Sequence, residues 1–169
     1  MIFRPYEIAR TAMLIENNSM MFYSALAEMA GEGKARDVLE TMSGQEKEHY
    51  QIMGQLHDKF YSWKIPESCG EEYEEQLWLL ADVNVLARNI DPDGLLKAAG
   101  TVAKAIDLAV SFEKDTVAFY LHLKAIMPPE EQAVVERIIE EEKAHIDGLL
   151  ALRAGMAQGL EEKCAERLN

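Results

Sequence analysis

Apolar residues along most of the chain recur at the three- to four-residue spacing of one helix face. Two breaks interrupt this pattern, at Gly31-Glu32-Gly33 and at Met127-Pro128-Pro129-Glu130. Because Gly and Pro end helices, each break predicts a short turn between two helices. The alternation of apolar and polar residues that marks strands is nearly absent. The pattern therefore predicts four long helices, near residues 5–30, 34–61, 96–127 and 130–165.

The segment between the second and third helices, residues 62–95, is less regular and contains Pro66, Gly70 and Asp91-Pro92-Asp93-Gly94. If the two helices that it joins run parallel, this connection must span the bundle. A helix of about 28 residues is roughly 42 Å long, and roughly 34 residues of extended chain reach much further. We therefore predict one domain, residues 1–169, with an all-α, ferritin-like four-helix bundle and one long crossover between helices 2 and 3.

Two parts of the chain repeat each other. The segments IENNSMMFY (15–23) and FEKDTVAFY (112–120) share a Glu followed, seven residues later, by a Tyr. The segments QEKEHY (45–50) and EEKAHI (141–146) share the motif Glu-x-x-His. Glu46 follows Glu16 by 30 residues, and Glu142 follows Glu113 by 29 residues. The chain is therefore predicted to contain two copies of one helical hairpin, each with a Glu on its first helix and Glu-x-x-His on its second.

The repeated polar residues lie on apolar helix faces. Residues three, four or seven positions apart share one side of a helix, and Glu16 shares its side with Ala9, Ala12 and Met13. Similar apolar neighbours surround the other members of the set, which is Glu16, Glu46, His49, Glu113, Glu142 and His145. The alternative is that all six are surface charges on Glu- and Lys-rich helices, but their position within apolar faces and their duplication argue against it.

Four carboxylates buried together would repel one another or take up protons, because an uncompensated buried charge is very costly. Two divalent cations supply enough positive charge to neutralise them. Carboxylate oxygen with imidazole nitrogen suits iron or manganese, and the lack of thiolate ligands argues against structural zinc. A Glu from two helices with Glu-x-x-His from the other two is the arrangement of di-iron carboxylate bundles. We therefore predict two iron ions per chain, with manganese or a mixed pair as alternatives.

Composition narrows the partners and the setting. The chain has 30 acidic and 17 basic residues, with a net charge of -13, which argues against nucleic acid or an anionic membrane surface as a partner. Cys69 and Cys164 are too few for a disulfide framework and form no CxxC pair, so neither is assigned a role. No signal peptide or membrane-spanning run is recognisable. We therefore expect a cytoplasmic protein.

With these motifs the chain resembles the rubrerythrin branch of the ferritin-like superfamily, over roughly residues 5–160 without the crossover. The resemblance implies a homodimer that reduces hydrogen peroxide or dioxygen, with electrons from a separate donor such as a rubredoxin-type protein. It also implies roles for the six residues. Glu46 and Glu142 would bridge the two metals, His49 and His145 would be terminal nitrogen ligands, and Glu16 and Glu113 would be the remaining oxygen ligands.

Two features depart from the family pattern. Rubrerythrins proper have a rubredoxin-like iron domain with two CxxC motifs, which this chain lacks. The peroxidases of the family also tend to carry an additional Glu one turn after the third-helix ligand, which lets an iron shift between His and Glu ligation. Thr116 occupies that position here. This departure argues against a redox-linked movement of the metal and leaves metal binding unaffected.

Other polar residues near the motifs have simpler interpretations. Tyr23 and Tyr120 either pack in the core with a locally bonded hydroxyl or donate a hydrogen bond that orients a carboxylate ligand. Glu48, Glu140 and Glu141 flank the motifs off the apolar face and are predicted to be solvated surface. His57 and His122 have no acidic partner on a core-facing stripe and are predicted to be ordinary helix residues.

The ligand set leaves three other functions open. The same centre serves ferroxidases linked to iron storage, and it also serves oxygenases that act on an organic substrate. A third alternative, from another class, is an interaction or scaffold bundle that retains ligand-like residues without using metal. Metal content distinguishes this last alternative from the others.

Overall fold

The structure, a computed structural model, describes residues 5–60, 79 and 84–166, without the side chains of Pro5 and of residues 159–166. Its four long helices are α1 (Pro5–Ala30), α2 (Lys34–Phe60), α5 (Val102–Ile126) and α6 (Pro129–Glu166). Between α2 and α5 lie the short 3-10 helix η1 (Val85–Ala87) and the two-turn helix α4 (Pro92–Ala99). The described ranges contain no β-strand.

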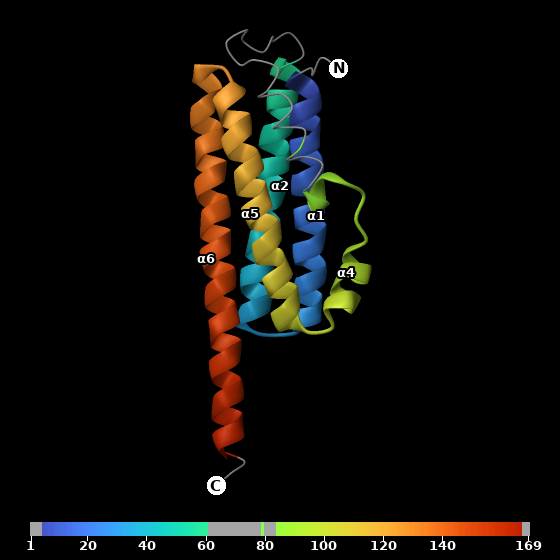
Figure 1. The fold of residues 1–169 in the computed structure, drawn as a ribbon, viewed down its shortest axis with the longest axis vertical. Coiled ribbons are helices and arrows are strands. Elements are labelled where there is room, and N and C mark those ends of the chain that lie inside the picture. Colours follow the sequence, from blue (N-terminus) through green and yellow to red (C-terminus); the bar gives the residue numbers. More distant parts are fainter. Residues whose placement is uncertain (1–4, 61–78, 80–83, 167–169) are drawn as a thin grey trace.

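The long helices form two antiparallel hairpins, α1 with α2 and α5 with α6 (Figure 1). In the view of Figure 1, α1 and α6 descend, whereas α2 and α5 ascend, so α2 and α5 are parallel. The chain must therefore return along the bundle between them, and η1 and α4 lie beside α1 on this path. The predicted ferritin-like four-helix bundle with one long crossover is confirmed.

The first two predicted helices match α1 and α2 to within one residue, but the predicted third helix, 96–127, is wrong at its start. The apolar pattern continues through residues 96–101, yet α4 ends at Ala99 and α5 begins only at Val102. Gly100 adopts a left-handed conformation, with φ at 75°, and its N–H donates to the carbonyl of Leu96. The side chain of Thr101 then caps α5 by accepting from the N–H of Lys104. Gly100 therefore ends one helix and Thr101 directly begins the next, so the continuous apolar pattern is divided between two helices.

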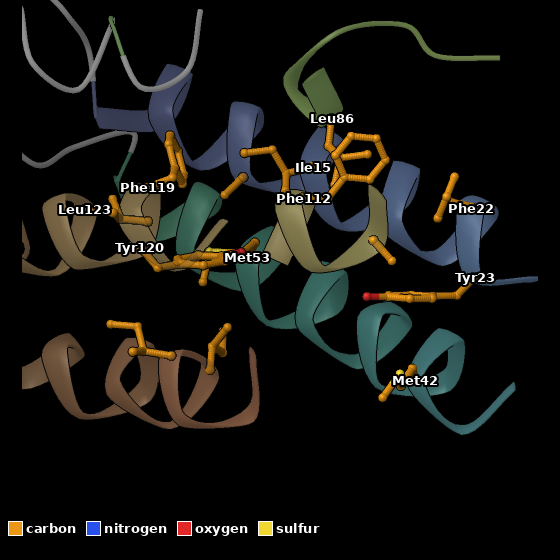
Figure 2. Close-up of a cluster of buried hydrophobic side chains, with 14 of the residues drawn as sticks. Ile15, Phe22, Tyr23, Met42, Met53, Leu86, Phe112, Phe119, Tyr120 and Leu123 are labelled. Carbon is orange, nitrogen blue, oxygen red and sulfur yellow. The ribbon is translucent and has the colours of Figure 1, made fainter. Parts of the chain in front are cut away.

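The core is apolar and receives side chains from all four long helices (Figure 2). Its aromatic residues pack edge to face, as Phe22 of α1 and Phe112 of α5 do, with ring centroids 5.3 Å apart. Asn18 of α1 ties down the end of the crossover, because its Nδ2 donates to the carbonyls of Leu86 at 2.7 Å and Arg88 at 2.6 Å. This packing fixes the register of the helices and therefore the positions of the polar residues between them.

Helix α6 is the longest element and continues well past the end of the bundle (Figure 1). None of the helices, as far as the structure describes them, is long and apolar enough to cross a membrane. Cys69, much of the predicted crossover and the side chain of Cys164 lie outside the described residues.

Candidate metal centre

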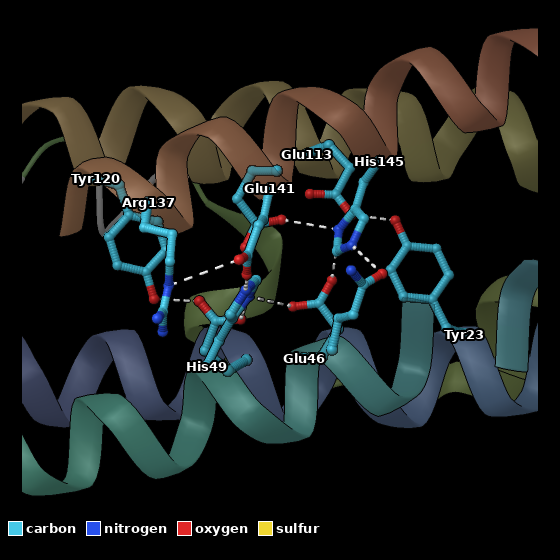
Figure 3. A network of polar contacts seen from close by, with 11 residues as sticks. Tyr23, Glu46, His49, Glu113, Tyr120, Arg137, Glu141 and His145 are labelled. Atoms are coloured by element: carbon cyan, nitrogen blue, oxygen red, sulfur yellow. Dashed lines mark hydrogen bonds and ion pairs between the residues drawn. The ribbon is translucent and has the colours of Figure 1, made fainter. Parts of the chain in front are cut away.

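The six residues singled out by the repeat converge in the middle of the bundle. Each is buried, and none exposes more than 2% of its surface. They come from all four long helices, with Glu16 on α1, Glu46 and His49 on α2, Glu113 on α5, and Glu142 and His145 on α6. The i, i+3 spacing on α2 and α6 directs each Glu and His pair to the same side of its helix. Figure 3 labels four of them, Glu46, His49, Glu113 and His145, which face one another across the core.

Their ligand atoms form two overlapping groups, and within each group the atoms lie within 4.8 Å of one another. One group contains Glu16, Glu46, His49 and Glu142, and the other contains Glu46, Glu113, Glu142 and His145. Glu46 and Glu142 belong to both. This geometry suits two metal ions that share these two carboxylates, and each ion would have one further Glu and one His.

The histidines point the same ring nitrogen at the carboxylates. Nδ1 of His49 lies 2.9 Å from Oε1 of Glu142 and 3.5 Å from Oε2 of both Glu16 and Glu46. Nδ1 of His145 lies 3.1 Å from both Glu46 Oε1 and Glu142 Oε2. The two imidazole centroids are 6.1 Å apart. Both Nδ1 atoms therefore face the shared carboxylates, where a metal ion could reach them.

Without a metal, protons stabilise this cluster. Burial raises the pKa values of Glu16 and Glu113, and the charges of Glu142 and Glu46 raise them further. For the histidines burial acts in the opposite direction, but the surrounding carboxylates outweigh it, so the pKa of His49 rises and that of His145 reaches about 12. Burial also opposes ionisation of Glu142, yet its close contacts with the imidazoles of His145 and His49 lower its pKa well below the usual range. The metal-free cluster therefore holds protons where cations would balance the carboxylates.

The unpaired atoms of the cluster fit a pair of cations. Buried polar atoms without a hydrogen-bond partner are costly and uncommon in proteins. Among the described side chains, five such atoms gather here: Glu16 Oε2, Glu46 Oε1, Glu46 Oε2, His49 Nδ1 and Glu142 Oε1. Once the Nδ1 proton of His49 is released, all five atoms can donate a lone pair to a metal. The residues present therefore suit two divalent ions, although their role as ligands stays a prediction.

Two buried tyrosines hold the outer carboxylates. The hydroxyl of Tyr23 donates to Oε1 of Glu113, and the hydroxyl of Tyr120 donates to Oε1 of Glu16. Each Tyr reaches the Glu of the other hairpin, because α1 and α5 are antiparallel and the Tyr lies two turns beyond its own Glu. Of the two interpretations from the sequence, the structure therefore shows the hydrogen bond to a candidate ligand.

Glu141 was predicted to be solvated surface, and this prediction is wrong in part: the side chain is 35% exposed, but it also contacts a candidate ligand. Its Oε2 lies 2.7 Å from Nε2 of His49, and its other oxygen lies 3.6 Å from Nε of Arg137. On the opposite side, Oε1 of Gln45 lies 3.1 Å from Nε2 of His145. Gln45 and Glu141 each directly precede the Glu of a Glu-x-x-His motif. This shared position in the sequence is the signal that could have identified them.

The other flanking residues behave as predicted. Glu48 and Glu140 are exposed. His57 lies near the end of α2, with its Nδ1 3.1 Å from Asp58, and His122 faces the backbone carbonyl of Ala118 at 2.9 Å. Thr116 is buried one turn after Glu113, and its hydroxyl has no hydrogen-bond partner.

Comparison with known proteins agrees with this architecture. The rubrerythrin family model matches residues 7–153. A solved structure from Thermotoga maritima, described as a ferritin-like diiron-carboxylate protein, superposes with a TM-score of 0.61 and 21% sequence identity. The match covers 90% of this chain and 95% of that chain. No curated protein has a significantly similar sequence. The chain belongs to the rubrerythrin family.

Proposed function

We propose that the protein is a non-haem di-iron redox protein that reduces hydrogen peroxide or dioxygen with electrons from a separate donor protein. The observation that carries the proposal is the buried cluster of four carboxylates and two imidazoles, in which Glu46 and Glu142 are shared by two ligand groups. Membership of the rubrerythrin family supports iron as the metal. The similar structure from Thermotoga maritima is described as a diiron-carboxylate protein, which also supports iron.

Each chain residue has a distinct task in this proposal. Glu16 and His49 would hold one ion, Glu113 and His145 the other, and Glu46 and Glu142 would lie between them. When bound, a pair of ferrous ions supplies the two electrons that convert one hydrogen peroxide and two protons into two water molecules. The hydroxyls of Tyr23 and Tyr120 keep a proton directed at the carboxylates of Glu113 and Glu16, which fixes the orientation of both side chains.

The bundle also controls access to the centre. The apolar side chains around the cluster are buried, so few solvent molecules would reach it. Exclusion of water strengthens the electrostatic interactions inside the site and limits side reactions. We propose a homodimer in the cytoplasm as the functional form, with a rubredoxin-type protein as the electron donor, because the chain contains no CxxC motif of its own.

Rapid mixing of the anaerobic, ferrous-loaded protein with hydrogen peroxide tests the proposed reaction. We expect oxidation of the protein-bound iron to be much faster than oxidation of the same concentration of free ferrous ion. The matched control is the Glu46→Gln variant, which keeps the shape of the side chain but removes a charge shared by both ligand groups. Oxidation of the wild type no faster than that of free ferrous ion would refute the redox proposal.

A further inference from the structure

The contacts around the centre follow an internal two-fold symmetry. Four polar residues of the first hairpin have counterparts of the same type in the second. These pairs are Glu16 and Glu113, Tyr23 and Tyr120, Glu46 and Glu142, and His49 and His145. The contacts are paired in the same way, since Tyr23 bonds Glu113 and Tyr120 bonds Glu16. The two ligand groups are also equivalent under this exchange. By these residues alone, the two metal positions would be chemically identical.

The outer nitrogens of the histidines break this symmetry. Nε2 of His49 lies 2.7 Å from the carboxylate of Glu141, whereas Nε2 of His145 lies 3.1 Å from the side-chain carbonyl of Gln45. Gln45 and Glu141 occupy corresponding positions in the two hairpins. One histidine therefore contacts an acid and the other contacts a neutral amide of nearly the same shape.

The difference extends one turn further on α6. Arg137 lies 3.6 Å from the second oxygen of Glu141. The corresponding residue on α2 is Thr41, whose hydroxyl donates to the backbone carbonyl of Asp37 at 2.8 Å. The His49 side thus has a carboxylate paired with a guanidinium, and the His145 side has neither charge.

This difference changes the two imidazoles as ligands. Because Nδ1 of each ring faces the cluster, metal binding through Nδ1 requires the ring proton on Nε2, and that proton is donated outward. A carboxylate acceptor attracts the Nε2 proton more strongly than an amide carbonyl does, so it leaves more electron density on Nδ1. The stronger donor binds its metal more tightly and favours the higher charge on that metal.

We propose that Glu141 is a positioning residue that makes the two metal positions unequal: the position of His49 and Glu16 binds its ion more tightly than the position of His145 and Glu113. This inference rests on the proposed dinuclear centre. Partners of ligating histidines typically change metal affinity by about 10–100-fold, so we expect the two positions to differ by about 10-fold.

Cobalt(II) titration, followed by the visible absorption of the bound ion, measures each position separately in single-ligand variants. His145→Ala leaves the His49 position, and His49→Ala leaves the His145 position. We expect His145→Ala to bind cobalt about 10-fold more tightly than His49→Ala does. The two outer partners are then exchanged by combining Gln45→Glu with Glu141→Gln, which preserves composition and net charge. In this exchanged background the order of the two affinities should reverse.

A further comparison separates the electronic effect from a structural one. Glu141→Gln alone should weaken cobalt binding about 10-fold in the His145→Ala background and leave it unchanged in the His49→Ala background. Equal affinities, or an order that the exchange does not reverse, would overturn the inference while leaving the dinuclear centre intact. A folded wild-type protein that binds no cobalt would overturn both the inference and the proposed function.

Discussion

Single residues determine the chemistry of this bundle, because the same fold with an apolar interior would be inert. Glu142 has the most central position, since its two oxygens contact His49 and His145. Glu46 has the corresponding position on α2. Substitution of either residue affects both ligand groups at once, whereas substitution of Glu16 or Glu113 affects only one.

Glu142→Gln is expected to abolish tight binding of both ions, because it removes a charge that both positions share. Substitution of a residue that only hydrogen-bonds to a metal ligand typically lowers metal affinity by about 10–100-fold. Because Glu142 is itself a candidate ligand of both ions, we expect the metal affinity to fall by more than about 100-fold. Isothermal titration with ferrous ion under anaerobic conditions measures the loss. Glu140→Gln is the matched control, because Glu140 is exposed two residues away and its carboxylate pairs with Lys143, so its substitution should leave the metal affinity unchanged. Normal binding by Glu142→Gln would contradict the assignment.

Tyr23→Phe is expected to weaken the position that contains Glu113, because it removes the hydroxyl that holds this carboxylate. We expect a roughly 10-fold loss of affinity at this position and little change at the other. The phenyl ring retains the packing, so the fold should remain intact by circular dichroism. Tyr50→Phe is the control, since Tyr50 is 39% exposed. If Tyr23→Phe binds both ions like the wild type, the tyrosine serves packing alone.

Metal binding is expected to release protons. The pKa values of His49 and His145 are raised in the metal-free protein, as are those of Glu16 and Glu113, so these groups carry protons that the metal must displace. Affinity should therefore increase with pH through the neutral range, with release of about two protons or more per chain, one from each imidazole. Calorimetry in buffers of different ionisation enthalpy measures the number, and zero release would contradict the protonation pattern.

At the scale of elements, helix periodicity predicted most of the fold and of the candidate site. Glu-x-x-His places both side chains on one side of a helix, and the apolar neighbours on that side predicted that the pairs of α2 and α6 face the core. The hydrogen-bond partner of Tyr23 could not be predicted from helix spacing, because Tyr23 reaches Glu113 only when α1 and α5 lie antiparallel. Glu141 was missed because position on a helix face does not reveal how far a long, partly exposed side chain reaches.

The boundary between α4 and α5 is a testable element-scale feature. Gly100 has φ at 75°, a conformation that costs a residue such as Ala about 1 kcal/mol or more. Gly100→Ala is therefore expected to destabilise the protein by about 1 kcal/mol, although an added Cβ meets no atom within 4 Å. Gly44→Ala is the matched control, because Gly44 lies within α2 and also has open space, so this change should stabilise by about 0.5–1 kcal/mol. Urea denaturation measures both, and the prediction fails if the two changes have the same sign.

At the scale of the whole molecule, four of the 30 acidic residues are glutamates buried together in the core. A bundle of this size tolerates four buried glutamates only if cations or protons balance them. The extension of α6 past the bundle lies away from this cluster, so it does not bear on whether the centre binds metal.

The most direct test of the account is the amount of metal in the folded protein. Protein loaded with ferrous ion under anaerobic conditions and then desalted is analysed by inductively coupled plasma mass spectrometry, alongside Glu142→Gln. The account predicts about two irons per chain in the wild type, the content of di-iron bundles, and far less in the variant. A wild type that remains helical by circular dichroism yet retains almost no metal would contradict it, and the repeated Glu-x-x-His motif would then need a different explanation.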